Sequence, residues 1–379
     1  MKIGFDAKRA FQNNTGLGNY SRSLIDSLAT GYPEHDYYLF APKETGMYNW
    51  KRFPDMHLIT PQARVHKWLK SVWRSRMVVP VLQREGIDIY HGLSHEIPFG
   101  IHDSGIRSVV TMHDLIFERY PSQYNPIDVM TYRRKARYAC KYADVVVAIS
   151  EQTKQDLITY YNTPAAKIQV VYQSCDPAFA RLHTPEAIEA FKAKYGLPAG
   201  YFLYVGSVIE RKNLLGIVKA MRILGDRNRL PLAVLGNGGG YRNRVLEVLK
   251  QYGMEQEVIW LNDRARLDNS ELPQLYQGAK ALVYPSLFEG FGIPILEALW
   301  SGTPVITSSG SCFGETAGDA ALYVDPLEPA SIAEAMERIL NDDALAADLR
   351  SKGFKHAQLF TADKCAAAMM NVYNSISKK

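Results

Sequence analysis

The feature that most constrains the fold is an alternation of short apolar runs with amphipathic stretches, which occurs twice along the chain. The first series runs from KIGFDA at residues 2–7 to IQVVYQ at 168–173, and the second from YFLYVGS at 201–207 to ALYVD at 321–325. Continuous apolar runs of this kind are typical of parallel strands that helices cover on both faces. The pattern therefore predicts an α/β protein with two Rossmann-like domains.

Length and punctuation predict where the domains divide. A chain of 379 residues is too long for one ordinary core, and prolines interrupt the strand pattern between residues 177 and 198. We expect domains at 1–180 and 181–358, and a last helix at 359–379 that lies outside the second alternation. Ligands of open α/β sheets bind beyond the carboxyl ends of the strands, so we expect substrates in a cleft between the domains.

Composition indicates a globular protein of a reducing compartment. Hydrophobic residues make up 47% of the chain and charged residues 22%, and no apolar run approaches the ~20 residues of a membrane span. The start of the chain carries no apolar signal segment. The cysteines are far apart and form no C-x-x-C pair, which disfavours a zinc site and a disulfide framework. We expect a cytoplasmic protein with reduced thiols.

The positive charge is concentrated in the first half of the chain. Residues 1–176 carry 22 Lys and Arg against 17 Asp and Glu, whereas the remainder carries 22 of each. This excess favours an anionic partner such as a membrane surface or a phosphorylated acceptor.

A basic, aromatic stretch at residues 65–84 could meet such a surface. Its apolar stripe and surrounding cations are typical of an interfacial amphipathic helix at the inner face of the membrane, although a stripe facing the core has the same spacing. A second basic stretch follows at 132–142. The stripe and its cations are Val65, Lys67, Trp68, Leu69, Lys70, Val72, Trp73, Arg74 and Arg76.

Two motifs in the first half follow strands. Gly16 and Gly18 in NNTGLGNYSRSL suit either a phosphate loop at a helix start or an ordinary turn. Ser21 occupies the third glycine position of a dinucleotide fingerprint, which disfavours a dehydrogenase. His113 and Asp114 follow the strand SVVTM, and a neighbouring carboxylate can orient a catalytic imidazole or simply satisfy a structural one.

Two cations follow the first strand of the second half. Arg211 and Lys212 in VIERKNL lie in the loop and first turn of a helix, where cations are electrostatically unfavourable by themselves. A bound diphosphate would relieve this, with arginine binding as a fork. The alternative is a solvated pair of charges.

The stretch EGFGIPILE combines a loop and a helix start. Gly290 and Gly292 free the loop from steric limits, and Pro294 suits the first helical position. Glu289 then precedes the helix, and Glu297 lies about one turn inside it. A helix end for phosphates with two acceptors for sugar hydroxyls predicts a nucleotide-sugar site. The chain contains no D-x-D motif, so we expect no metal grip on the diphosphate by that motif.

These segments together resemble retaining glycosyltransferases of family 4. EGFGIPILE is similar to the E-x7-E signature of the family, and TGLGNYSRSLI, TMHDLIFERYP, ADVVVAISEQTKQDL, YVGSVIERKNL and GDAALYVDP match in order along nearly the whole chain. The resemblance implies the GT-B fold, with the last helix crossing back to the N-terminal domain. The N-terminal domain would then face the acceptor, and the C-terminal domain the nucleotide sugar.

The resemblance implies a role for each matching residue. His113 would contact the donor sugar near the reacting centre, Arg211 and Lys212 would stabilise the leaving diphosphate, and Glu289 would bind sugar hydroxyls. Further donor contacts would come from Gly16, Gly18, Gly206, Phe291, Gly292, Ile293 and Glu297, with Glu297 on the ribose and the base near Asn262 and Arg264. Asp114 and His91 would lie on the acceptor side. LND at residues 261–263 departs from the family, where glycine is common, so base identity stays open.

The implied reaction is a metal-independent, retaining hexosyl transfer without a cofactor. TMHDLIFERYP is most similar to bacterial mannosyltransferase-like members, which favours GDP-mannose as donor ahead of UDP-sugars. The acceptor would be an oligosaccharide or polyprenyl-linked glycan of surface polysaccharide or lipopolysaccharide synthesis, with no nucleic-acid partner. The alternatives are a nucleotide-sugar 2-epimerase, which needs no acceptor, and a catalytically silent binding protein, which the presence of His113, Lys212 and Glu289 disfavours.

Overall fold

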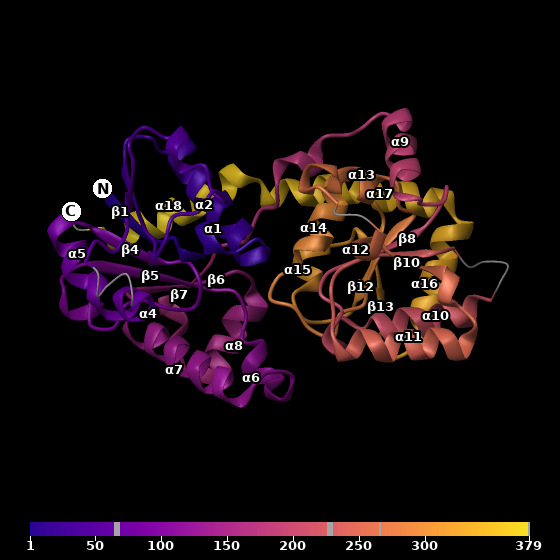
Figure 1. The fold of residues 1–379 in the computed structure, drawn as a ribbon, viewed down its shortest axis with the longest axis horizontal. Coiled ribbons are helices and arrows are strands. Elements are labelled where there is room, and N and C mark those ends of the chain that lie inside the picture. Colours follow the sequence, from indigo (N-terminus) through magenta and orange to yellow (C-terminus); the bar gives the residue numbers. More distant parts are fainter. Residues whose placement is uncertain (64–68, 226–229, 265–266, 378–379) are drawn as a thin grey trace. The chain divides into compact units, whose positions relative to one another are not determined.

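The computed structural model describes residues 1–63, 69–225, 230–264 and 267–377, and these form two compact units (Figure 1). Unit 1 comprises Met1–Ser174 together with Phe360–Lys379, and unit 2 comprises Cys175–Leu359. The chain therefore leaves unit 1 six residues before the expected boundary at 180, and returns to it at its end.

Unit 1 is built on a seven-stranded parallel sheet in the order β3-β2-β1-β4-β5-β6-β7. Ile3 lies opposite both Tyr37 and Ile89, so the chain adds strands on one side of β1 and then on the other. The order reverses between β1 and β4, which makes this pair the topological switch point. The strands are β1 (Lys2–Asp6), β2 (Asp36–Phe40), β3 (Met56–Ile59), β4 (Ile89–Gly92), β5 (Arg107–Met112), β6 (Val145–Ala148) and β7 (Ile168–Val170).

Helices cover both faces of this sheet. One buried cluster joins β1 to α2 and α18 through residues such as Phe5, Ile25 and Met369, and Figure 1 shows the yellow α18 beside α2. A second cluster, which includes Leu82 and Ala139, covers the other face. The helices are α1 (Lys8–Gln12), α2 (Gly16–Gly31), α4 (Lys70–Val72), α5 (Val78–Glu85), α6 (Ile116–Arg119), α7 (Pro126–Tyr142), α8 (Glu151–Tyr161) and α18 (Ala362–Ile376).

Side-chain caps fix where several helices begin. Ser150 Oγ accepts a hydrogen bond from the backbone N–H of Thr153 at 3.0 Å and starts α8. Thr361 Oγ1 accepts from the backbone N–H of Lys364 at 3.3 Å and starts α18. Each bond satisfies one of the N–H groups that a helix start leaves without an intrahelical partner.

For two central residues of the stretch at 65–84, the structure favours the alternative of a stripe that faces the core. Trp73 is 1% exposed and Arg74 9%, and the helix is interrupted by a π-helical turn, η2 (Trp73–Met77). Trp73 belongs to a core cluster of unit 1. Arg74 makes ion pairs with the buried Asp6 and with Glu96. Val65, Lys67 and Trp68 lie outside the described residues.

A search of the described helices finds none that is long and apolar enough to cross a membrane.

Unit 2 repeats the plan with a six-stranded parallel sheet in the order β10-β9-β8-β11-β12-β13. The order reverses between β8 and β11, so this pair is the switch point. The strands are β8 (Phe202–Val205), β9 (Leu232–Leu235), β10 (Val258–Trp260), β11 (Ala281–Tyr284), β12 (Val305–Ser308) and β13 (Ala321–Val324). The two parallel sheets confirm the predicted α/β class.

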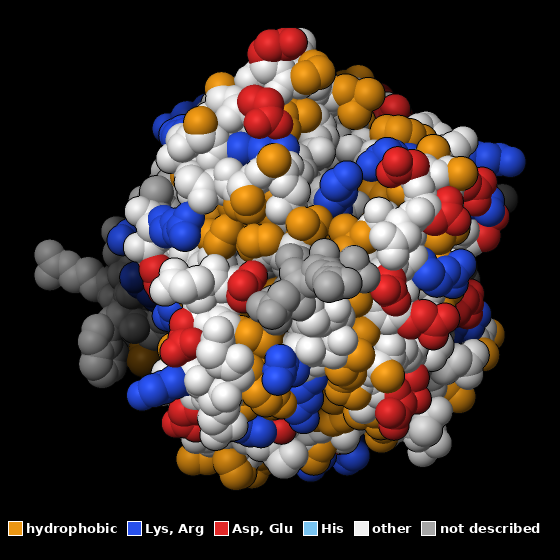
Figure 2. Space-filling view, turned by 90° about the vertical axis from the view of Figure 1, so that its right-hand side faces the viewer, with side chains coloured by type: hydrophobic (Ala, Val, Ile, Leu, Met, Phe, Trp, Pro, Cys, Tyr) orange, Lys and Arg blue, Asp and Glu red, His pale blue; other side chains and the backbone are white. Residues whose placement is uncertain are grey.

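One buried cluster packs α10, α11 and α16 against this sheet, as Leu214, Leu249 and Met336 show. Figure 2 shows positive side chains (Lys, Arg) and negative side chains (Asp, Glu) mixed on the face of unit 2 that it draws. This agrees with the second half of the sequence, which carries equal numbers of both. The helices are α9 (Pro185–Tyr195), α10 (Leu214–Leu224), α11 (Gly240–Tyr252), α12 (Leu261–Arg264), α13 (Leu272–Gln277), α14 (Ile293–Trp300), α15 (Phe313–Ala317), α16 (Pro329–Asn341) and α17 (Asp343–Ala357).

Candidate functional site

The loop after β8 brings two cations to the switch point of unit 2. Arg211 and Lys212 lie in a short 3-10 turn, and α10 begins only after Asn213, whose side chain accepts from the N–H of Gly216 at 3.2 Å. The cations therefore precede the helix rather than forming its first turn. Gly206 has a φ of +136°, and a Cβ there would come within 3.0 Å of the Lys212 side chain, so glycine leaves room for the lysine.

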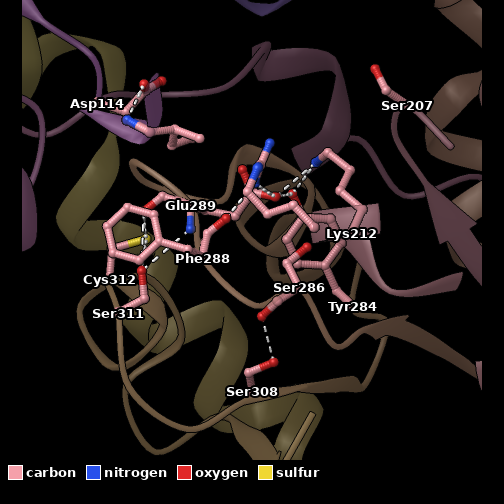
Figure 3. Close-up of polar contacts among 12 residues, drawn as sticks. Asp114, Ser207, Lys212, Tyr284, Ser286, Phe288, Glu289, Ser308, Ser311 and Cys312 are labelled. Atoms are coloured by element: carbon pink, nitrogen blue, oxygen red, sulfur yellow. Dashed lines mark hydrogen bonds and ion pairs between the residues drawn. The ribbon is translucent and has the colours of Figure 1, made fainter. Parts of the chain in front are cut away.

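Glu289 is the centre of the cluster (Figure 3). Its Oε1 lies 2.9 Å from Arg211 Nη1 and 2.9 Å from Lys212 Nζ. The Tyr284 hydroxyl donates to the same oxygen at 2.9 Å, and Lys212 Nζ donates to that hydroxyl at 2.6 Å. All three partners meet Oε1, and among the described residues Oε2 has no hydrogen-bond partner.

Burial and charge together set the ionisation of Glu289. Its side chain is about 8% exposed, and this burial opposes ionisation. The charges of Lys212 and Arg211 outweigh burial and lower the pKa of Glu289 to about 2. The carboxylate is therefore ionised at neutral pH, and its two cations leave the cluster with a surplus of positive charge.

The loop that carries Glu289 is fixed by the segment after β12. Ser311 Oγ accepts from the Glu289 N–H at 3.3 Å and lies 3.1 Å from its carbonyl oxygen, while Cys312 Sγ donates to that carbonyl at 3.3 Å. Ser311 has a φ of +48°, an uncommon conformation for a residue with a side chain. The loop position of Glu289 thus depends on residues more than 20 positions away in the sequence.

The helix of EGFGIPILE begins one residue earlier than expected. Gly292, with a φ of +91°, is the N-cap residue of α14, and Pro294 occupies the second helical position. The first N–H groups of a helix lack intrahelical partners and carry partial positive charge. The backbone N–H groups of Gly292 and Ile293 therefore lie at the edge where Glu289, Arg211 and Lys212 meet, whereas Phe291 precedes the N-cap.

Glu297 lies one turn inside α14 and behaves differently. The Tyr276 hydroxyl donates to Glu297 Oε2 at 2.6 Å, and no cation of the described residues makes an ion pair with it. Burial raises the pKa of Glu297 to about 7, although the hydrogen bond from Tyr276 works against this rise. The two glutamates of the signature therefore differ in protonation. Glu289 stays a carboxylate, whereas Glu297 gains or loses its proton near neutral pH.

The residues expected near the base, Asn262 and Arg264, both lie in α12, directly after β10. Asn262 Oδ1 accepts from the backbone N–H of Gly236 at 2.8 Å, so this side chain ties the segments after β9 and β10 together. Arg264 Nη1 donates to the carbonyl oxygen of Gly196 at 2.8 Å, at the end of α9. Both side chains bind backbone groups in this structure.

In unit 1, His113 is a neutral, fixed imidazole at the end of β5. It is 5% exposed, and its Nε2 lies 2.9 Å from the Leu93 carbonyl oxygen, which places the proton on Nε2. Nδ1 is then an acceptor, 3.4 Å from the Gln173 amide nitrogen. Burial, then the neighbouring His95, lowers the pKa of His113 to about 3, so it can accept or donate a hydrogen bond but carries no charge.

His91 was expected on the acceptor side, and the structure contradicts this. Its side chain is 0% exposed, with Nδ1 at 2.7 Å from the Tyr373 hydroxyl and Nε2 at 2.8 Å from Thr111 Oγ1. Both ring nitrogens are thus satisfied inside unit 1. His91 lies within β4, one residue before its end, and ties the sheet to α18 instead of meeting a ligand.

The other expected residues of unit 1 have clear local roles. Gly18 lies so close to the Asn13 carbonyl oxygen that an added Cβ would come within 1.8 Å of it, whereas the space around Gly16 is open. Asp114 Oδ1 accepts from the N–H of Ile116 at 3.0 Å at the start of α6. The described residues contain no group of three or more His, Cys, Asp or Glu side chains able to hold a metal ion.

Two tyrosines of the unit 2 site could not be identified from the sequence patterns. Tyr284 closes β11 and contacts both Lys212 and Glu289, and its position at a strand end is the signal that could have revealed it. Tyr276, inside α13, has no such signal, because its contact with Glu297 joins two helices that only the fold brings together.

Comparison with known proteins agrees with this geometry. Residues 187–356 match the family model of Glycosyl transferases group 1, and residues 15–179 match that of Glycosyltransferase Family 4. The O-antigen chain mannosyltransferase B of Escherichia coli is 31% identical over 390 residues, which cover 98% of this chain and 99% of that protein. The O-antigen chain mannosyltransferase RfbU of Salmonella typhimurium is 30% identical over 231 residues, or 61% of this chain and 60% of RfbU.

Solved structures share the fold along the whole chain. A glycosyltransferase from Rickettsia africae aligns with a TM-score of 0.75 and 18% identity, covering 99% of this chain and 98% of that one. HepE of Anabaena, solved in complex with UDP, aligns with a TM-score of 0.75 and 17% identity over 99% of this chain and 100% of HepE. The fold is thus GT-B, and the chain belongs to the glycosyltransferases of family 4.

Proposed function

We propose that the chain is a retaining mannosyltransferase that moves mannose from GDP-mannose to an oligosaccharide or polyprenyl-linked glycan in lipopolysaccharide O-antigen synthesis. The observation that carries the proposal is the cluster of Arg211, Lys212 and Glu289 at the switch point of unit 2. The choice of mannose follows the full-length similarity to O-antigen chain mannosyltransferase B.

The cluster suits a nucleotide sugar in both charge and hydrogen bonding. Arg211 and Lys212 together exceed the charge of Glu289, so a diphosphate between them and the start of α14 would complete the pairing. Glu289 Oε2 would accept a hydrogen bond from a hydroxyl of the transferred sugar. Glu297 would accept hydrogen bonds from the ribose hydroxyls. The base would lie near the loops that Asn262 joins, beside Arg264.

In the mechanism we propose, the residues stabilise charge on the leaving group. As the glycosidic bond breaks, negative charge grows on the diphosphate oxygens, which Lys212 and Arg211 are placed to stabilise. Glu289 is a poor nucleophile, because its Oε1 is held by two cations and its pKa is about 2. Front-face attack is then the route to retention, with the diphosphate accepting the proton of the acceptor hydroxyl and His113 orienting the sugar.

We propose that this chemistry requires no metal or cofactor. The two cations of the cluster are positioned to do what a divalent ion does elsewhere, namely offset the charge of the diphosphate. We place the reaction in the cytoplasm, on the side of the membrane where nucleotide sugars are made, with unit 1 on the acceptor side. Peripheral contact with an anionic membrane surface remains part of the proposal, supported by the basic charge of residues 1–176.

A thermal-shift screen followed by product analysis tests the proposal. A ligand at 100 times its Kd that binds only the folded state stabilises it by about 2.7 kcal/mol. We expect GDP-mannose and GDP to raise the unfolding temperature, and UDP-glucose to leave it unchanged. If only UDP-sugars raise the unfolding temperature, the donor is a UDP-sugar and not GDP-mannose. Proton NMR should show an α-linked product, because the donor is an α-glycoside and the configuration is retained.

The principal alternative is a nucleotide-sugar 2-epimerase on the same fold. It would convert the nucleotide sugar without any acceptor. Appearance of the C2 epimer when nucleotide sugar and protein are incubated alone would favour this alternative over transfer.

A further inference from the structure

The switch point of unit 1, between β1 and β4, is the counterpart of the donor edge in unit 2. Ligands of open α/β sheets bind at such points, beyond the carboxyl ends of the strands. The segments that follow these two strands are Ala7–Arg9 and Leu93–Glu96, and they contain four charged or titratable side chains: Lys8, Arg9, His95 and Glu96. None of the four belongs to a motif that the sequence patterns predict to be functional.

The carboxylates at this edge are already paired. Arg74 Nη1 lies 2.6 Å from Asp6 Oδ2, and its other terminal nitrogen makes an ion pair with Glu96. Lys135 Nζ lies 2.8 Å from the second oxygen of Glu96. Two carboxylates and two cations thus balance each other, with Asp6 and Arg74 both buried.

Lys8 and Arg9 are two further cations in addition to this balanced group. Both side chains are half-buried, and neither makes a hydrogen bond or ion pair with any described residue. Burial, followed by the charges of Arg74 and Arg9, lowers the pKa of Lys8, so the lysine occupies a site that disfavours its charge. The charges of Glu96 and Asp6 offset this lowering only in part. Two half-buried cations that make no ion pair are costly unless an anion completes the site.

His95 adds a hydrogen-bond donor in a strained conformation. Its φ is +61°, a strained conformation for a residue other than glycine, and such residues cluster at functional sites. Its N–H donates to the Thr111 carbonyl at 3.0 Å, and its Nε2 accepts from the His113 N–H at 2.7 Å. In the neutral ring the proton is then on Nδ1, which has no hydrogen-bond partner among the described residues.

We propose that Lys8, Arg9 and the Nδ1–H of His95 bind a phosphate or diphosphate group of the glycosyl acceptor. This rests on the proposed transferase function, since it assigns the acceptor to this edge. The His95 ring lies 5.5 Å from that of His113, so the phosphate would sit close to the residue that we place at the donor sugar. The acceptor class is therefore a phosphorylated saccharide, either linked to a lipid diphosphate or free as a sugar phosphate.

The test is a calorimetric titration of the full chain with inorganic diphosphate. The Lys212→Ala background is used throughout, because it weakens the competing diphosphate site of unit 2. Removing one charge-assisted hydrogen bond to the diphosphate should weaken binding roughly tenfold. The double variant Lys8→Gln/Arg9→Gln should therefore bind roughly a hundredfold more weakly, while Arg9→Lys, which keeps the charge, should stay within a few-fold of the parent.

A control removes one positive charge from the opposite edge of the sheet. Arg84 lies in the last turn of α5, the helix that leads into the amino end of β4, and its side chain is 70% exposed. Arg84→Gln should bind diphosphate as the parent does. If the double variant unfolds, His95→Asn carries the test, since asparagine tolerates a positive φ, and we expect a roughly tenfold loss. Equal affinity of parent and folded variants, or no binding by the parent, would overturn the proposal.

Two further ligands distinguish the sources of the phosphate. Tighter binding of farnesyl diphosphate than of mannose 1-phosphate supports a lipid-linked acceptor, and the reverse order supports a free sugar phosphate. If the proposal is right, the binding of both ligands depends on Lys8 and Arg9. Because no nucleotide is present, failure of GDP-mannose to bind unit 2 would refute the proposed donor without affecting this result.

Discussion

Replacing Glu289 by glutamine should destabilise unit 2 strongly while preserving the shape of the side chain. The substitution leaves Arg211 and Lys212 buried without their shared counter-ion, and removing one partner of a buried pair costs roughly 3–5 kcal/mol. The pKa of Glu289, lowered from 4.5 to about 2, gives a second figure of roughly 3 kcal/mol for the same interaction. The two figures agree, so we expect a loss of about 3 kcal/mol at pH 7.

The loss of unfolding free energy in Glu289→Gln should depend on pH. A carboxylate whose pKa is lower in the folded state stabilises the protein above its unfolded pKa, and this contribution disappears as pH falls through the folded value. The difference between wild type and Glu289→Gln should therefore be complete above pH 4.5 and shrink toward pH 2. Urea denaturation at several pH values, with one probe for each unit, measures it.

Glu210→Gln is the matched control, one residue before Arg211. Its side chain is 60% exposed and lies 3.6 Å from Arg244, and exposed ion pairs contribute about 0–1 kcal/mol. Added inorganic diphosphate should restore Glu289→Gln more than it stabilises wild type, because an anion can replace the missing charge. A loss below about 1 kcal/mol at pH 7, or one equal to that of Glu210→Gln, would refute the account of this cluster.

Three further predictions concern other parts of the two units. Lys212→Ala should lower kcat by roughly a hundredfold or more with the fold intact, and a kcat within twofold of wild type in a GDP-release assay would contradict its role. Glu297 accepts hydrogen bonds from hydroxyl groups best as a carboxylate, and its pKa is about 7, so the affinity for GDP should rise between pH 6 and pH 8. Calorimetry should find no such rise in Glu297→Gln. An equal rise in both proteins would refute the assignment. Tyr373→Phe removes the partner of His91 Nδ1 and should cost about 1–3 kcal/mol of unfolding free energy without changing GDP affinity, and a large loss of affinity would show that this tyrosine does more than hold α18.

The fold could be predicted from the sequence because parallel strands leave a simple signal. Runs such as VVVA at β6 are apolar at every position, since helices cover both faces of the sheet. Glu289, Arg211 and Lys212 could be located for a related reason, because each follows such a run. Their common contact at Glu289 Oε1 could not, since it depends on loops fixed by Ser311, far along the chain.

One prediction failed, and one open alternative was decided, where a local pattern had more than one physical meaning. His91 stands near a strand end, but it precedes Gly92 within β4 and is covered by α18, from almost 300 residues downstream. Trp73 belongs to a stripe with helical spacing, but it is buried within a π-helical segment, next to Arg74, which pairs with Asp6. In both cases the deciding partner is distant in sequence, and no local spacing reveals it.

We place nucleotide-sugar binding at the switch point of unit 2, through Lys212, Arg211 and Glu289. Calorimetric titration of GDP-mannose into wild type and Lys212→Ala tests it most directly. We expect saturable binding to one site in wild type and an affinity at least tenfold lower in the variant, since the variant lacks one charge-assisted hydrogen bond to the diphosphate. Equal affinity in the two proteins, or no binding of GDP-mannose to folded wild type, would contradict it.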